Sequence, residues 1–489
     1  MRDDEIRRIL TDGNPWWKAA AASQDPTMWI SSHRLLRDRF VYDLGFRSEV
    51  LDDVSREPIT DRLVVLTGPR RVGKSVVLLD AAASLCRRKD LDPRCVIHLP
   101  CDGFKVRDLR RALTLGRELT RVVDRQTATR RVWLLDEVSA IQGWTSVLKA
   151  ARDGTDFGDD TVVITGSRWS PTDDIEGNLF AGRAGVSSAR RIRHLLPMNF
   201  RHFLAATRPD LALPAAAHPA ELQQATVADT LDELRFAVDA YDLAWQEYLT
   251  CGGFPRAVAE QQNQGAVSAT YALDLAAWLR HDVDPEFSPE SIPLLLEALA
   301  TRATSPLNIR RTAEALGYTN DRFTVRLHRL TNSFGALWCP QRNDHGRTIP
   351  GALSKFYLID PLLAWIPSIL RAGCTQPTMT SLTESTLAVS LARAIERLDE
   401  GRWVSSDTIG YSRTGSNNEI DLAPVAVPSS AGPTLTLPIE VKWVDDGWRS
   451  GARVIEAKYG RGVLATKSVL DTDHSTWAVP APLLALLLL

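Results

Sequence analysis

Cysteine is scarce in this sequence, and its few copies are scattered. Six cysteines stand among 489 residues, with no C-x-x-C pair and no zinc-finger spacing. This argues against a disulfide framework and a structural zinc site, and we expect reduced, mostly buried thiols. Long apolar runs are missing too: no stretch approaches the ~20 residues that cross a bilayer, and no signal-peptide core follows Met1. We therefore expect a cytoplasmic protein with no membrane partner.

A net charge of one sign is also absent. Lys and Arg number 58 against 60 Asp and Glu, which gives a formal charge of −2. No field of the whole protein attracts nucleic acid or a membrane surface, so any nucleic-acid contact must come from a local patch. The length predicts roughly three domains.

Short apolar segments alternate with helix-like segments from residue 63 onward. The expected strands are Leu63 to Thr67, Cys95 to Leu99, Val132 to Leu135 and Thr161 to Thr165. This alternation predicts an α/β fold with a parallel sheet that is covered by helices on both faces.

A glycine-rich motif, G-P-R-R-V-G-K-S, follows the first of these strands and opens a helix from Val76 to Cys86. Glycines let backbone N–H groups curl around phosphate oxygens at a helix N-terminus. We expect Lys74 to reach the β- and γ-phosphates of ATP and Ser75 to bind Mg²⁺. A purely structural glycine turn is the alternative, which the strand and helix context makes rare. The expected ATP-binding residues are Gly68, Pro69, Arg70, Arg71, Val72, Gly73, Lys74, Ser75 and Val76.

Two acids end the strand that begins at Val132. Asp136 is expected beside the glycine-rich loop, where it would hold Mg²⁺ through water, and Glu137 would orient the attacking water. The alternative is that both acids only cap the next helix. The pattern therefore predicts an ATPase with Lys74, Asp136 and Glu137 as catalytic residues.

The next strand ends in I-T-G-S, which puts a hydroxyl at the sensor position of such ATPases. Ser167 is the first choice for this sensor and Thr165 the second. Arg183 and Arg256 are candidates for a cationic contact to transition-state charge, from a lid or a neighbouring subunit. The alternative for each is a solvated surface arginine.

The C-terminal part contains N-E-I-D-L and P-I-E-V-K, separated by a turn-like segment. A hairpin that turns at Ser430 and Ala431 pairs Asp421 with Glu440 and Glu419 with Lys442, all on one face. A Mg²⁺ between Asp421 and Glu440 could activate water, with Lys442 stabilising phosphate charge. The alternative is a half-exposed hairpin with ordinary cross-strand ion pairs, such as Glu419 with Lys442.

Residues 306–360 read as two short helices, a turn and a two-stranded wing. Arg322, Arg326 and Arg329 recur at helical spacing in the second helix and could meet DNA phosphates. A solvated helix face or a protein contact is the alternative. Elsewhere we expect a helix over Met28 to Phe40, a connector without core residues at 205–232, and a helix over Ser381 to Leu398.

Seven segments occur in an order that is similar to a prokaryotic family of AAA+ ATPases: NPWW, GPRRVGKS, LLDEVSAIQGW, ITGS, AGR, LLPMNFRHFL and YLTCGGFP. Its members resemble an AAA+ core fused to a C-terminal domain of unknown function, itself similar to PD-(D/E)xK nucleases. The resemblance covers roughly residues 14–442 and implies a nuclease-like set of Glu384, Asp421, Glu440 and Lys442. Ser139 and Arg256 depart from the family's usual residues.

The resemblance also implies a division of the chain. We expect a helical lead-in at 1–60, an AAA+ P-loop core at 61–204, a connector and helical lid at 205–300, a winged helix at 301–370 and a restriction-endonuclease-like domain at 371–489. The function implied is a Mg²⁺-dependent ATP-driven switch that acts on DNA. The alternatives are an ATPase scaffold or remodelling factor for a protein partner, with an inactive nuclease-like domain, and a nearly inert nucleotide-binding regulator. By analogy, ATPases of this class assemble as homo-oligomers.

Overall fold

The computed structural model divides into two compact units, Met1–Leu196 and Pro197–Leu489. It describes residues 1–42, 44, 63–121, 130–154, 160–167, 192–286, 288–400, 402–404, 408–415 and 418–488. Each unit has its own sheet or sheets and its own helices.

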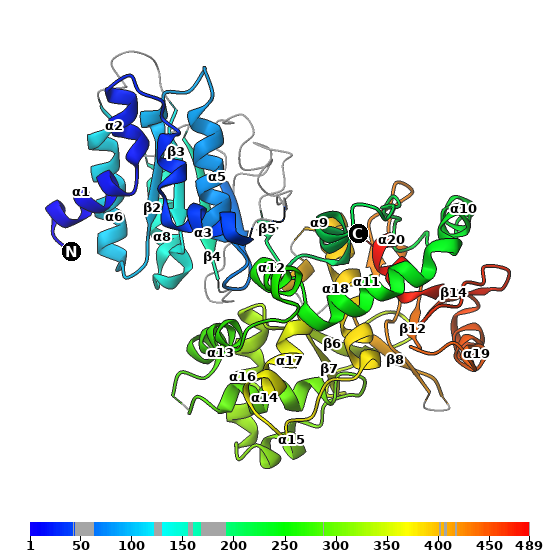
Figure 1. Ribbon diagram of the computed structural model, residues 1–489. Helices are drawn as coiled ribbons and strands as arrows, with labels where there is room; N and C mark the ends of the chain where they lie inside the picture. Colours follow the sequence, from blue (N-terminus) through cyan, green and yellow to red (C-terminus); the bar gives the residue numbers. More distant parts are fainter. Residues whose placement is uncertain are drawn as a thin grey trace. The chain divides into compact units, whose positions relative to one another are not determined.

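The first unit is built on a five-stranded sheet (Figure 1). Its strands are β1 (Leu63–Thr67), β2 (Val96–Pro100), β3 (Val132–Asp136), β4 (Thr161–Gly166) and β5 (Ile192–His194). They lie in the order β2-β3-β4-β1-β5, and every pair is parallel. The four predicted strands and their parallel arrangement are confirmed, whereas the short strand β5 was not predicted.

Helices lie on both sides of this sheet (Figure 1). They are α1 (Asp3–Asp12), α2 (Pro15–Ala21), α3 (Arg34–Tyr42), α5 (Lys74–Cys86), α6 (Val106–Leu119) and α8 (Trp144–Asp153). One hydrophobic core joins apolar residues of α1, α6 and α8 to the same face of the strands, with Trp133 fully buried. A Cβ at Gly116 of α6 would lie 2.9 Å from the Trp133 ring, so glycine lets this helix approach the sheet closely.

The prediction of a continuous helix over Met28 to Phe40 is wrong. A short 3-10 turn spans Met28–Ser31, and α3 begins only at Arg34. Trp29 packs on Trp16 with ring centroids 5.0 Å apart, and the Ser32 hydroxyl donates to the Trp29 carbonyl at 3.0 Å. Serine competes in this way with helical hydrogen bonding, and the helix breaks.

The second unit begins with helices that pack around buried aromatic residues. They are α9 (Phe200–Thr207), α10 (Ala225–Leu234), α11 (Val238–Cys251), α12 (Pro255–Gln264), α13 (Ala269–Val283) and α14 (Ser291–Ala300). The expectation of a core-free connector at 205–232 is wrong, because α10 buries Val227 and Leu231. These two residues and Leu234 follow the spacing of one helix face, which the many Ala, Thr and Asp residues obscured in the sequence.

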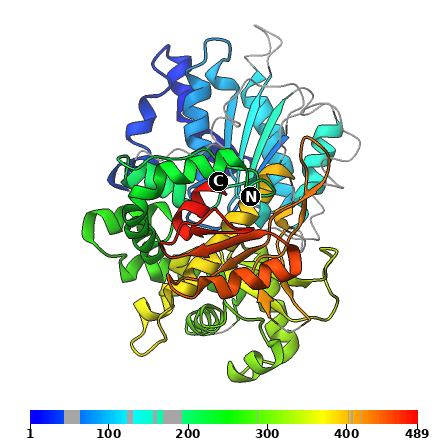
Figure 2. The same ribbon diagram turned by 90° about the vertical axis from the view of Figure 1, so that its right-hand side faces the viewer.

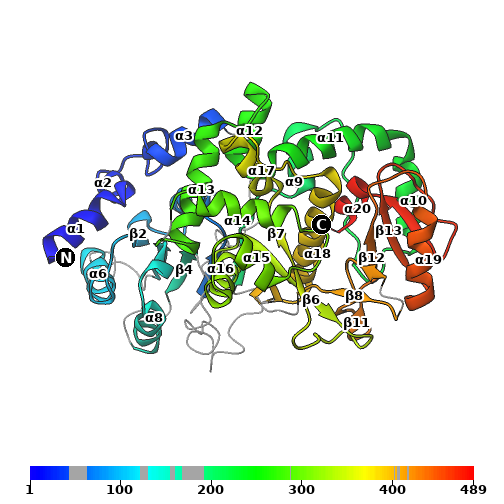
Figure 3. The same cartoon turned by 90° about the horizontal axis from the view of Figure 1, so that it is seen from below.

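Two helices, a turn and an antiparallel strand pair follow, as predicted. They are α15 (Ile309–Ala315), α16 (Asn320–Asn332), β6 (Ala336–Arg342) and β7 (Ser354–Leu358). The strand pair does not stand alone, because β6 also pairs with β8 (Tyr411–Arg413), which in turn pairs with β9 (Glu419–Ile420) (Figure 3). The expected boundary at residue 370 therefore crosses a single four-stranded sheet, β7-β6-β8-β9.

The remaining elements complete the C-terminal part. They are α17 (Pro361–Leu370), α18 (Met379–Leu398), β10 (Ala426–Val427), β11 (Thr434–Leu435), β12 (Ile439–Val441), α19 (Trp448–Tyr459), β13 (Gly462–Thr466), β14 (Thr476–Pro480) and α20 (Ala481–Leu487). Strands β12, β13 and β14 form a parallel sheet, and α19 runs along it (Figure 2). The apolar helix α20 is buried. No helix among the described residues is long and apolar enough to cross a membrane.

The predicted hairpin register is the one that the structure has. Ala426 pairs with Leu435, Val427 pairs with Thr434, and Leu422 forms a bridge with Ile439. The chain turns between Ser429 and Gly432, whose backbones exchange two hydrogen bonds. In this register Asp421 lies opposite Glu440.

Candidate functional site

The glycine-rich loop leaves β1 and enters α5 through three residues with positive φ. Gly68 has a φ of 151°, Arg71 of 70° and Gly73 of 100°. A Cβ at Gly68 would lie 2.0 Å from the Leu195 carbonyl oxygen, so only glycine fits there. The loop ends at Gly73, the residue that precedes the 13-residue helix α5. Because the first N–H groups of a helix have no partner within it, this loop presents backbone donors to an anion.

Lys74 is held inside this loop. Its ammonium group donates to the carbonyl oxygens of Gly68 and Pro69, at 2.8 Å each, and the residue is buried. Two carbonyl oxygens thus hold the ammonium group at the loop, where a lysine suits a polyphosphate group. The residues expected to bind ATP therefore lie in one loop and the first turn of one helix.

The acids Asp136 and Glu137 lie at the same edge of the sheet, since β3 is parallel to β1 and only β4 separates them. The Thr165 hydroxyl donates to Asp136 Oδ1 at 2.6 Å and accepts the Glu137 N–H at 2.8 Å. The Ser167 hydroxyl and N–H both contact Glu137 Oε1, the latter at 3.1 Å. Glu137 itself has a φ of 55°, an uncommon conformation for a residue other than glycine. Two hydroxyls from β4 and the residue after it thus fix the two acids.

These residues fit a magnesium ion at the nucleotide. Asp136 presents a carboxylate at the end of β3, and Ser75 presents a hydroxyl in the first turn of α5. Oxygen ligands of these two types are those that Mg²⁺ uses beside nucleotide phosphates. Ser75 and Asp136 are thus the residues that would hold the ion.

Asp102 is an acid at this edge that sequence reasoning missed. It follows β2, whose last residue Pro100 pairs with Asp136. Partial burial, and then the charges of Glu137 and Asp136, raise the pKa of Asp102 above its usual value. The available signal was its position two residues after a strand of the same sheet.

The structure describes one of the two candidate arginines. Arg183 lies outside the described residues. Arg256 pairs with Glu260 at 2.9 Å and lies over the Tyr271 ring, 5.0 Å from its centroid, within the second unit.

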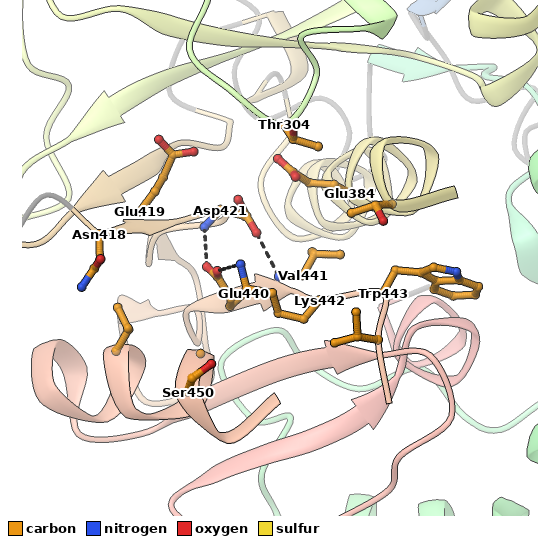
Figure 4. Close-up of a pocket in the computed structure, with 14 residues that line it drawn as sticks. Thr304, Glu384, Asn418, Glu419, Asp421, Glu440, Val441, Lys442, Trp443 and Ser450 are labelled. Atoms are coloured by element: carbon orange, nitrogen blue, oxygen red, sulfur yellow. Dashed lines mark hydrogen bonds and ion pairs between the residues drawn. The ribbon is translucent and has the colours of Figure 1, made fainter. Parts of the chain in front are cut away.

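A cavity of about 620 Å³ in the second unit brings the predicted C-terminal residues together (Figure 4). Its lining includes Glu384, Glu419, Asp421, Glu440, Lys442, Asn418, Trp443 and Ser450. The Asp421 N–H donates to Glu440 Oε2 at 3.2 Å, and the Val441 N–H donates to Asp421 Oδ2 at 2.9 Å. Lys442 pairs with Glu440 at 2.9 Å. We call this cavity the acid pocket.

Lys355 contacts three acids of the acid pocket without lining the cavity itself, and sequence reasoning missed it. Its ammonium nitrogen lies 2.8 Å from Glu384 Oε1, 2.7 Å from Glu419 Oε1 and 2.8 Å from Asp421 Oδ1. Its side chain is 0% exposed. Burial lowers the pKa of Lys355, but Asp421, Glu384 and Glu419 outweigh burial and raise it well above its usual value.

Burial also acts on the acids themselves. It raises the pKa of Glu384, with a further contribution from the charge of Asp421, although Lys355 and the Tyr357 hydroxyl oppose the shift. Burial likewise raises the pKa of Glu440, with the charge of Asp421 adding to the shift and Lys442 opposing it. Two acids of the pocket therefore hold their protons more tightly than an exposed carboxylate does.

The magnesium ion expected between Asp421 and Glu440 stays a prediction. Among the described residues, no group of three or more His, Cys, Asp or Glu side chains is arranged to hold a metal. Both oxygens of Asp421 accept hydrogen bonds, from Lys355 and from the Val441 N–H. Both oxygens of Glu440 are likewise engaged, by Lys442 and by the Asp421 N–H. Each of these four oxygens thus has one donor of the protein beside it, and a carboxylate oxygen has two lone pairs.

The arginine stripe expected on α16 is corrected. Arg326 is buried, its guanidinium pairs with Asp284 at 2.6 Å, and it lies 4.3 Å from the Tyr318 ring centroid. The reason is that α16 packs through Phe323, Leu327 and Leu330, and Arg326 shares that buried face. Arg322 and Arg329 are exposed, so only these two members of the stripe face solvent.

The comparison with protein families finds one match, and it lies mostly in the first unit. Residues 60–204 match the family model described as an AAA domain. No curated protein is similar enough in sequence to match the chain.

Several solved structures are similar to the chain at low identity, among them these three. A Walker-type ATPase of Pyrococcus abyssi is 16% identical, with 66% of this chain and 96% of that chain covered and a TM-score of 0.37. The ORC2 protein of Aeropyrum pernix is 11% identical, with 68% and 96% covered and a TM-score of 0.31. The Bacillus subtilis DNA clamp loader delta protein is 8% identical, with 59% and 87% covered and a TM-score of 0.24. TM-scores this low assign no partner to the chain.

The family match covers the strands, the loop and the acids described above. ATP-hydrolysing proteins of this class share one arrangement: a glycine-rich loop that holds a lysine follows one strand, and a parallel strand of the same sheet leads into Asp-Glu. Residues 60–204 of this chain are therefore similar to an AAA domain, and they carry the loop and the acids described above.

Proposed function

We propose that the chain hydrolyses Mg-ATP at residues 68–76 and that the state of the nucleotide switches what the unit Pro197–Leu489 binds. The observation that carries this proposal is the pair of hydroxyls that fix the acids: Thr165 on Asp136, and Ser167 on Glu137. A hydroxyl that orients the candidate base Glu137 beside the phosphate loop is useful for hydrolysis, whereas a site that only binds nucleotide does not need it.

Each residue then has a role that its position supports. The N–H groups of the loop and the Lys74 ammonium hold the β- and γ-phosphates, and Ser75 and Asp136 hold the ion. Magnesium, when bound, neutralises charge on the phosphates. Glu137 orients the water that attacks the γ-phosphate, and Ser167 fixes the direction of the Glu137 carboxylate.

ATP turnover and ATP binding, measured separately, test this proposal. Glu137→Gln should keep nucleotide affinity and lose turnover by about a hundredfold or more, because the amide cannot accept a proton from water. Lys74→Ala should lose binding itself. Turnover at the wild-type rate in Glu137→Gln would refute the role of Glu137, and unchanged nucleotide affinity in Lys74→Ala would refute the site.

DNA is the first candidate for what the switch acts on. The supporting observation is the hairpin register, which sets Asp421 opposite Glu440 and next to Lys442 in one pocket, as in PD-(D/E)xK nucleases. A protein partner is the second candidate, supported by the burial of Arg326, which leaves only Arg322 and Arg329 of the predicted DNA-contact residues exposed.

Cleavage and stimulation assays separate the two candidates. Single- and double-stranded DNA are incubated with the wild-type chain, Asp421→Asn and Lys442→Ala, with Mg²⁺ or Mn²⁺, with and without ATP. Cleavage that both variants lose would establish an ATP-linked nuclease. Absence of cleavage and of any DNA effect on ATP turnover would leave the protein-partner candidate, and gel filtration with ATP would test assembly into a homo-oligomer.

A further inference from the structure

Two segments of the sequence, LLPMNFRHFL and YLTCGGFP, meet at Met198 and Gly253. A Cβ at Gly253 would lie 1.8 Å from the Met198 carbonyl oxygen, and the Met198 N–H donates to the Gly253 carbonyl at 2.7 Å. The Tyr248 hydroxyl donates to the Met198 carbonyl at 2.9 Å. Only glycine fits at residue 253, because the backbone of Met198 lies directly against it.

Other groups of the second unit hold the residues on either side of Met198. The Arg393 guanidinium donates to the Pro197 carbonyl at 2.7 Å. The Asn199 side chain accepts the His202 N–H at 2.8 Å, at the start of α9. Pro197, Met198 and Asn199 are therefore each fixed by a hydrogen bond within this unit.

Leu195, two residues before Pro197, is held by the first unit instead. Its N–H donates to the Thr67 carbonyl at 2.8 Å, which extends the pairing of β5 with β1 by one residue. A Cβ at Gly68 would lie 2.0 Å from the Leu195 carbonyl oxygen. Leu195 thus lies against the first residue of the phosphate loop, and Leu196 alone stands between Leu195 and Pro197 in the sequence.

The link through Leu196 is stiff for a reason of local chemistry. Proline fixes its own φ near −65° and restricts the residue before it to extended conformations. Consecutive Cα atoms are also about 3.8 Å apart whatever the conformation of a trans chain. Leu196 therefore has little freedom to absorb a movement of Leu195 before it reaches Pro197.

We propose that residues 195–199, the connecting segment, transmit the state of the phosphate loop to the second unit. The inference rests on the proposed function, because it names the route by which bound nucleotide acts on that unit. Leu195 is the contact at the loop and Met198 is the contact at Gly253. Both are positioning residues, since neither touches the nucleotide.

Nucleotide binding changes the loop at the residue that Leu195 contacts. The Lys74 ammonium group donates to the Gly68 and Pro69 carbonyls, and it leaves them when it turns to the phosphates. Gly68 then depends more on its contact with Leu195. A connecting segment that is firmly held therefore favours the nucleotide-bound loop, and by reciprocity bound nucleotide favours a firmly held segment.

Tyr248→Phe tests the first half of this reciprocity. The change removes the hydroxyl that donates to Met198 and should weaken binding of a non-hydrolysable ATP analogue with Mg²⁺ by about threefold to tenfold, measured by titration calorimetry on the full chain. Tyr241→Phe is the matched control: Tyr241 is buried on the same helix α11, and its hydroxyl donates to the Ala212 carbonyl at 2.7 Å. The two variants lose the same kind of bond and should lose similar stability, but Tyr241→Phe should keep the wild-type affinity.

Hydrogen exchange tests the second half. In the wild-type chain the analogue should slow exchange by about threefold or more in peptides that cover Met198 and Gly253, measured by mass spectrometry. Peptides of α19, elsewhere in the second unit, should not respond. Pro197→Ala keeps the carbonyl that Arg393 contacts but releases the restriction on Leu196, so this variant should bind the analogue and lose most of the protection.

Three results would overturn the inference while nucleotide binding is intact. They are equal analogue affinities for Tyr248→Phe and Tyr241→Phe, unchanged exchange at Met198 and Gly253, and full protection in Pro197→Ala. A wild-type chain that binds no analogue would overturn the proposed function as well. Titration calorimetry of the wild-type chain shows which of the two failures has occurred.

Discussion

Raising the pH from about 5 to 8 should lower the free energy of unfolding of the unit Pro197–Leu489, because the buried carboxyl group of Asp360 loses its proton. Asp360 is 1% exposed and precedes helix α17. Its two oxygens accept the Leu362 N–H at 3.0 Å and the Gly253 N–H at 2.7 Å. Burial raises the pKa of Asp360 to about 7, while the two N–H groups and Arg393 oppose the shift only in part.

The sign follows from which state binds the proton more tightly. The pKa rises from 3.8 in the unfolded chain to about 7 in the folded one. Between these values the folded state holds a proton that the unfolded state has lost, so each pH unit upward costs about 1.4 kcal/mol of unfolding free energy. The contribution is complete below the unfolded pKa and is lost as the pH rises to the folded pKa. From pH 5 to pH 8 the loss is about 3 kcal/mol, or roughly 5–10 °C in the unfolding midpoint.

Scanning calorimetry of the wild-type chain and Asp360→Asn across this pH range measures the effect. Asparagine accepts only one of the two N–H bonds, so the variant should be less stable at acid pH by about 1–3 kcal/mol. It cannot titrate, so its midpoint should fall less with pH, and the two proteins should converge near pH 8. Glu440, whose pKa is also raised, titrates in both proteins and cancels in the difference. A constant difference between the two midpoints at every pH would refute the reasoning.

Three further changes have outcomes that the structure fixes. Ser167→Ala removes the hydroxyl that contacts Glu137, the candidate base. This change should lower ATP turnover by about tenfold to a hundredfold and leave nucleotide affinity unchanged, as measured by steady-state kinetics. Gly253→Ala would place a Cβ 1.8 Å from the Met198 carbonyl oxygen, and this overpacking against backbone should cost about 3 kcal/mol or more in thermal unfolding. Arg326→Met leaves a buried carboxylate unpaired and should cost about 3–5 kcal/mol, whereas Arg322→Met on the exposed face of α16 should change stability by less than about 0.5 kcal/mol.

The elements that were predictable are those whose signal is local in the sequence. Strand β1 is predictable to the residue because five apolar or Thr residues precede a glycine-rich loop, and the hairpin register follows from a turn centred at Ser430 and Ala431. Alternating faces then place Asp421 opposite Glu440 without reference to any tertiary contact. Patterns of period two and fixed turns carry enough information to fix such geometry.

Contacts between distant segments were not predictable in the same way. Lys355 meets Glu384 and Asp421 across 29 and 66 residues of sequence, and Arg326 meets Asp284 across 42. No spacing rule relates a lysine on one strand to acids on a later helix and strand. The same limit hid the joining of β6 to β8, which ties the expected winged helix to the expected nuclease-like domain in one sheet.

Lys355 and Arg326 nevertheless share a signal in the sequence. Lys355 opens the apolar strand residues Phe356–Leu358, and Arg326 lies between the apolar positions of α16. A charged side chain on a face that must be buried loses its hydration, so the fold is stable only if a carboxylate meets it. A lysine or arginine within an apolar pattern therefore predicts a buried acid from elsewhere in the chain. Applied to this sequence, the rule removes Arg326 from the DNA-contact set and places Lys355 against the acids of the acid pocket.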